Sequence, residues 1–115
     1  MATVRYDASH EQIAEGGIGG IRAVLLGDNL PEIRSLLLCL DGYLDPYYHR
    51  TLPYEREIWE VLQELILCSR DDGVIDACLQ LLGDYSCMPL SILEAGFSRV
   101  SEHRKPEVRA LLDRP

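Results

Sequence analysis

The segment NLPEIRSLLLCL, residues 29–40, decides the fold that the sequence predicts. Asn29 is a favourable N-cap, and Pro31 stands in the first turn of a helix, where a missing N–H costs nothing. Apolar residues then recur three and four positions apart, which places them on one face. We expect a helix from Asn29 to about Leu44 that is covered on more than one side.

Two later segments repeat this pattern. A shift of 41 residues places Ile33 on Val74, and a further shift of 34 places Val74 on Val108. Periods of this length are typical of helical-hairpin repeats, in which each unit covers the apolar face of the next. The sequence therefore predicts a short stack of antiparallel helical hairpins. The matched residues are Ile33, Leu36, Leu37 and Leu40, then Val74, Ala77, Cys78 and Leu81, then Val108, Leu111 and Leu112.

The rest of the chain predicts further helices and no confident strand, since alternating polar and apolar residues never persist. Four glycines between residues 16 and 20 interrupt any helix that begins at Ser9, so we expect a weakly ordered segment over residues 1–15. Asp45 and Pro46 end the helix that begins at Asn29. The prediction is a single all-α domain of about six helices over residues 1–115, with further helices near 18–25, 53–66, 72–85, 90–100 and 106–112.

The segments 29–34, 72–83 and 105–112 resemble the second helices of HEAT-type repeats. The resemblance covers the chain from Asn29 onward, and the middle copy lacks the Pro and Arg of the other two. It implies an α-solenoid that recognises proteins through an exposed helical face. It implies no catalytic residues.

Composition favours a basic partner. The 115 residues include 19 acidic and 11 basic ones, giving a net charge of −8 and a pI near 4.7. Such a chain repels phosphate backbones and anionic lipid surfaces, so we expect neither nucleic-acid nor membrane binding. A cationic protein surface would be attracted.

The four cysteines predict no metal or redox site. None forms a Cys-x-x-Cys pair, and no histidine stands nearby at ligand spacing. Free thiols in apolar helices suit a reducing cytosol. No basic and apolar leader opens the chain and no apolar run could span a bilayer, so we expect a cytoplasmic protein without cofactors.

Two candidate sites for chemistry are weak. His49 lies in a loop with Asp45 as its only evident orienting carboxylate, and no nucleophile is apparent. Glu57, Glu60 and Glu64 share one flank of a helix, but the Glu-x-x-His pair of helical-bundle metal sites is absent. We therefore expect no enzyme activity and interpret these acids as a solvated face or a partner-binding patch.

Aromatic residues cluster between Tyr43 and Trp59, next to acidic residues. Rigid rings rimmed by charge are typical of protein-binding hot spots, whereas core packing is an equally good interpretation for Tyr43 and Trp59. The predicted partner-binding residues are Asp41, Asp45, Tyr47, Tyr48, Glu57, Trp59, Glu60 and Glu64.

Two functions fit these features. The first is an immunity protein or antitoxin that neutralises a cognate basic toxin, because such inhibitors are small, acidic and without catalytic chemistry. In that case the free protein would be a monomer or a weak oligomer. The alternative is a structural or assembly subunit, such as an adaptor, a chaperone-like protein or a homo-oligomer that uses the open ends of the repeat stack.

Overall fold

A computed structural model describes residues 4–113, and over this range the chain is entirely helical, with no strand. The all-α prediction is confirmed, and the chain contains seven α-helices over this range, against the expected number of about six. The α-helices are α1 (Ala8–Glu15), α2 (Ile18–Leu25), α3 (Leu30–Leu44), α4 (Glu55–Cys68), α5 (Asp72–Tyr85), α6 (Ser91–Ala95) and α7 (Lys105–Leu112); single 3₁₀ turns are η1 (Pro46–Tyr48), η2 (Phe97–Arg99) and η3 (Glu102–Arg104).

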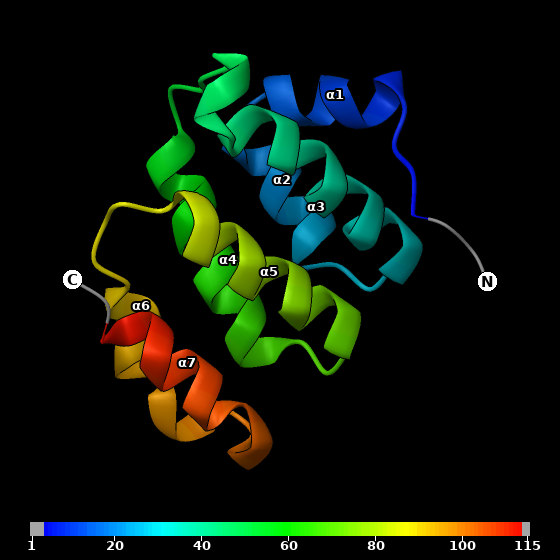
Figure 1. The fold of residues 1–115 in the computed structure, drawn as a ribbon. Coiled ribbons are helices and arrows are strands. Elements are labelled where there is room, and N and C mark those ends of the chain that lie inside the picture. The colour runs from blue at the N-terminus through cyan, green and yellow to red at the C-terminus, as the bar shows by residue number, and fades with distance from the viewer. Residues whose placement is uncertain (1–3, 114–115) are drawn as a thin grey trace.

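The helices after α1 lie in two rows. Helix α5 packs between α3 and α7 in one row, and α4 packs between α2 and α6 in the other. The rows are joined because α2 contacts α3 and α4 contacts α5. Figure 1 shows α3, α5 and α7 side by side and running in the same direction. The ends of α3 and α5 therefore meet at the same edge of the molecule.

Positions matched by the sequence repeat lie in the row formed by α3, α5 and α7. Ile33 of α3, Val74 of α5 and Val108 of α7 are all buried. Because each covers the seam to a neighbouring helix, apolar residues at this register are what the stacking requires. The superhelical order of a HEAT-type solenoid stays a prediction.

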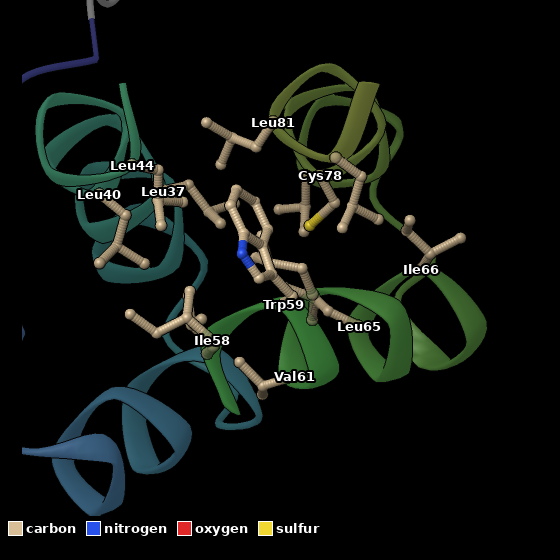
Figure 2. Close-up of a cluster of buried hydrophobic side chains, with 14 of the residues drawn as sticks. Leu37, Leu40, Leu44, Ile58, Trp59, Val61, Leu65, Ile66, Cys78 and Leu81 are labelled. Atoms are coloured by element: carbon tan, nitrogen blue, oxygen red, sulfur yellow. The ribbon is translucent and has the colours of Figure 1, made fainter. Parts of the chain in front are cut away.

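Trp59 of α4 lies at the centre of the core. Its indole is only 4% exposed and points from α4 into the space between α3 and α5, near Leu37 and Leu81 (Figure 2). A ring of this size contributes more buried apolar area than any aliphatic side chain in the seam. Because the Trp59 ring packs between α3 and α5, it sets the distance between these two helices.

Helix α1 falls inside the segment 1–15 for which weak order was predicted; residues 1–3 of that segment lie outside the described range. Asp7 caps α1 by accepting a hydrogen bond from the Ser9 N–H at 2.9 Å. The His10 ring completes a capping box, and its Nε2 lies 3.0 Å from Glu32 of α3. The sequence did not predict this docking because the contact joins residues 22 positions apart.

The apolar stripe over residues 90–100 is split into α6 and η2. A Cβ added to Gly96 would lie 2.5 Å from Cδ1 of Leu67, so a larger residue at this position would require the Leu67 side chain of α4 to shift. The chain turns at this point, and α6 ends at Ala95.

Arginine side chains link neighbouring helices within each row. Arg22 of α2 binds Glu64 of α4, and Arg34 of α3 binds Asp71, the N-cap of α5, at 2.7 Å. Arg104, whose side chain is 8% exposed, donates to Asp76 at 2.6 Å and to Asp72 at 3.0 Å. These charge-assisted bonds fix the register of the stack.

We expect Arg104→Ala to lower the free energy of unfolding by about 2 kcal/mol, because it removes hydrogen bonds to charged groups from a buried position. Lys105→Ala is the matched control. It removes an exposed pair with Glu102 and should change stability by less than about 0.5 kcal/mol. Urea unfolding of both variants checks the difference. Equal losses of unfolding free energy in the two variants would contradict a stabilising role for the Arg104 hydrogen bonds.

Candidate functional site

Carboxylates gather where α3 and α5 end. The Tyr85 hydroxyl donates to Asp45 Oδ2 at 3.4 Å, joining the two helices at this edge. The pKa of Tyr85 is raised well above its usual value, first by a hydrogen bond with Asp41, then by burial and by the charges of Asp41, Asp45 and Asp84. We call the residues Asp41, Asp45, Asp84 and Tyr85 the acidic edge.

Helix dipoles add to the negative charge of the acidic edge. The C-terminus of an α-helix carries a partial negative charge, which cationic side chains usually balance. Neither α3 nor α5, both of which the structure describes completely, has a basic residue in its last turn. The edge therefore holds negative charge that the two helices do not themselves compensate.

An apolar groove of about 380 Å³ runs between α3 and α5 toward this edge. Asp41 lines the groove on the side of the acidic edge, and Arg34 lines it near the beginning of α3. Leu38 is 40% exposed there. We call this hollow the α3–α5 groove; its lining residues are Val4, Arg34, Leu37, Leu38, Asp41, Gly73, Ala77, Gln80 and Leu81.

Two exposed tyrosines follow the acidic edge along the chain. Tyr47 is 79% exposed and Tyr48 is 57% exposed, and their rings meet edge to face with centroids 5.2 Å apart. Asp45 fixes this turn because its Oδ1 accepts a hydrogen bond from the Tyr47 N–H at 3.0 Å. The rings are thus presented on an ordered 3₁₀ turn and have area available for a partner.

The structure separates the predicted acidic residues into two groups. Asp41 and Asp45 lie at the acidic edge. Glu64 lies instead on the row of α2 and α4, where it receives hydrogen bonds from both terminal nitrogens of Arg22 at 2.7 and 3.2 Å. The charge of Glu60 also acts on Arg22, whereas Glu57 is exposed.

Trp59 is buried, which favours the core-packing interpretation of this residue over the partner-binding one. Its place at the border of the apolar stripe of α4 is compatible with either exposure or burial. The structure places the ring in the seam between α3 and α5, where it is buried. The core-packing interpretation also holds for Tyr43, which is 4% exposed.

Asp84 and Tyr85 are functional candidates that the sequence interpretation missed. Both end the helix predicted over residues 72–85. The repeat itself contained the signal, because stacked hairpins place equivalent helices parallel and bring their C-terminal ends together. Residues that follow the repeat in α3 and α5 could therefore have been considered as one group.

The described residues hold no group of three or more His, Cys, Asp or Glu side chains placed to bind a metal ion. His49 is exposed on the loop after η1, with φ at 54°. Burial raises the pKa of the Cys39 thiol to about 11 and also raises that of Cys78. Within residues 4–113, every helix is too short or too polar to cross a bilayer.

Comparison of the chain with protein-family models, with curated proteins and with solved structures gives no match. The resemblances to HEAT repeats and to immunity proteins therefore stay predictions, and the functional argument depends on the geometry of the surface.

We expect two of the four thiols to react quickly with an alkylating reagent at pH 8. Cys68 and Cys87 are exposed, whereas Cys39 and Cys78 are buried. With a pKa near 11, Cys39 is about one part in a thousand thiolate at this pH. Mass spectrometry of timed samples counts the modified thiols, and unfolding in guanidinium should release all four. A third fast thiol in the folded protein would contradict this packing.

Proposed function

We propose that this protein is a non-enzymatic binding module that recognises a basic surface of another protein through the acidic edge and the tyrosines of η1. The observation that carries the proposal is the convergence of two helix C-termini with three carboxylates and no basic residue in either last turn. A cationic partner would supply compensating charge that the last turns of α3 and α5 do not.

The arrangement also suits fast and specific association. Negative potential at one edge steers a cationic protein toward that edge and raises the association rate. Tyr47 and Tyr48 then offer rigid apolar area beside the charges, the combination from which binding hot spots are built. Because the edge belongs to regular helices, little conformational entropy is lost on binding.

An immunity protein or antitoxin is the role that fits these properties best. Proteins that act on nucleic acids or nucleotides carry basic surfaces, and a small acidic domain could cover such a surface. The same reasoning places the protein in the cytoplasm, where a toxin would act on the cell that makes it.

Self-assembly is the second candidate, and the surface supports it less. Two copies meeting at the acidic edge would place like charges together, which is destabilising. At the α6 and α7 end of the stack no large apolar residue is exposed within the described residues; the large exposed apolar residues of residues 4–113 are Val4, Tyr6, Leu26, Leu38, Tyr47 and Tyr48.

Charge reversal at the acidic edge tests the binding surface. With the partner in hand, Asp84→Lys should lower the association rate about tenfold at low ionic strength, since steering by a focused field contributes tenfold or more. Glu57→Lys, an equally exposed change on α4, should lower it no more than about twofold. Stopped-flow association at several salt concentrations measures both. If the two variants change the association rate equally, or if neither changes it, the acidic edge is not the binding surface.

Co-expression tests the role. The candidate partner is a protein encoded beside this one that binds it and has a basic surface. If the chain is an immunity protein, expression of that partner alone should stop growth, and co-expression with this chain should restore it. Asp84→Lys should restore growth less well than Glu57→Lys. A partner that binds at the acidic edge but leaves growth unchanged would contradict the immunity role and leave the binding function in place.

A further inference from the structure

We infer that the α3–α5 groove receives apolar side chains from a cationic, amphipathic segment of the partner, whose Lys or Arg residues reach the acidic edge. This inference rests on the proposed function and adds the chemistry of the segment that is recognised. The groove has an apolar floor and a carboxylate at one end, and a segment of this composition complements both features.

The floor of the groove is apolar and partly open to solvent. Leu37 and Leu81 form buried parts of the lining, while Leu38 stands 40% exposed on the wall that α3 contributes. A volume of about 380 Å³ lies in the range of ligand pockets and accommodates a few side chains. Covering Leu38 with an apolar group would remove its exposed surface from water.

Charge along the groove gives the segment a direction. Asp41 lines the groove and belongs to the acidic edge, where the dipoles of α3 and α5 also end. Arg34 lines the groove near the beginning of α3, but Asp71 accepts its hydrogen bond at 2.7 Å and balances its charge. Only the Asp41 end is therefore left to attract a cation, so the basic residues of the segment belong at that end.

The neighbouring hollow between α5 and α7 is less suited to such a segment. It shares Gln80 with the α3–α5 groove and contains Asp76 and Glu107. Arg104 donates to Asp76 at 2.6 Å and lies 3.8 Å from Glu107, so a cation of the chain itself already occupies the position between these two carboxylates. The hollow beside α6 is lined by a single carboxylate, Glu94, among its described residues.

Synthetic peptides test the inference without knowledge of the partner. The probe is an amidated 12-residue peptide of Leu, Lys and Ala whose leucines lie on one face of a helix. One control peptide replaces Leu with Ser, and a second replaces Lys with Glu. Titration calorimetry and ¹H–¹⁵N NMR spectra of the full chain should show that the Leu/Lys peptide binds at least fivefold more tightly than either control, with shift changes centred on residues 37–41 and 77–85.

Two leucines with the same exposure provide matched variants. Leu38 and Leu26 are each 40% exposed, but only Leu38 lines the groove. Leu38→Ser should weaken binding of the Leu/Lys peptide at least fivefold, and Leu26→Ser should leave it within twofold. Unchanged ¹H–¹⁵N spectra away from the substitution show that each variant remains folded, and Ala77→Gln, which adds bulk from the α5 side, gives an independent block of the groove.

The outcomes separate this inference from the proposed function. Equal effects of Leu38→Ser and Leu26→Ser on peptide binding, or equal binding of the Leu/Lys peptide and its Ser control, would overturn the inference that the α3–α5 groove binds apolar side chains. The acidic edge would still stand if Asp84→Lys slowed association with the natural partner. Tight binding of the Glu-containing control peptide would overturn the inference that basic residues of the segment bind at the Asp41 end of the groove.

Discussion

The packing of Trp59 between α3 and α5 is the contact on which the rest of the structure depends. The indole rises from α4 and fills the seam beneath two parallel helices, so it fixes their separation and links the two rows of the stack. Parallel packing brings the C-terminal ends of α3 and α5 to one edge. Without this seam, Asp41, Asp45 and Asp84 would not lie at the same edge, and the α3–α5 groove would lose the support beneath Leu37 and Leu81.

The distribution of basic residues explains why that edge stays negative. Within the described chain, five basic side chains form ion pairs with carboxylates of their own molecule: Arg22, Arg34, Arg50, Arg104 and Lys105. Two of them, Arg34 and Arg104, bind acids at the beginning of α5. The last turns of α3 and α5 contain no basic residue of their own, and Arg50, which stacks on Tyr43 of α3, pairs with Glu11 and Glu15 of α1. Part of the net charge of −8 is therefore concentrated at the acidic edge.

The sequence predicted those parts of the fold that depend on local chemistry. Asn29, Pro31 and the Asp45-Pro46 pair define a helix whose observed range, Leu30–Leu44, agrees with the prediction. Helix α5 is capped by Asp71 and spans Asp72–Tyr85, which agrees with the helix predicted near residues 72–85. The spacing of apolar residues also predicted which faces are buried, because that spacing is a property of the helix itself.

The missed features depend on contacts between distant residues. The split after α6 falls at Gly96, which lies against the Leu67 side chain of α4, and no local signal shows which distant residue lies there. Trp59 stood at the border of an apolar stripe, where only the neighbouring helices decide whether the ring is covered. Asp84 and Tyr85 join Asp41 and Asp45 only after α3 and α5 are packed side by side, whereas Glu64 belongs to α4 in the other row, where it pairs with Arg22.

Hydrogen–deuterium exchange of the complex with the partner tests most directly whether the acidic edge and the adjoining groove are the binding surface. We expect complex formation to slow exchange in residues 37–48 and 77–85 and to leave exchange on the flank of α4 that carries Glu57 unchanged. Protection confined to that flank, or to α6 and α7, would contradict it.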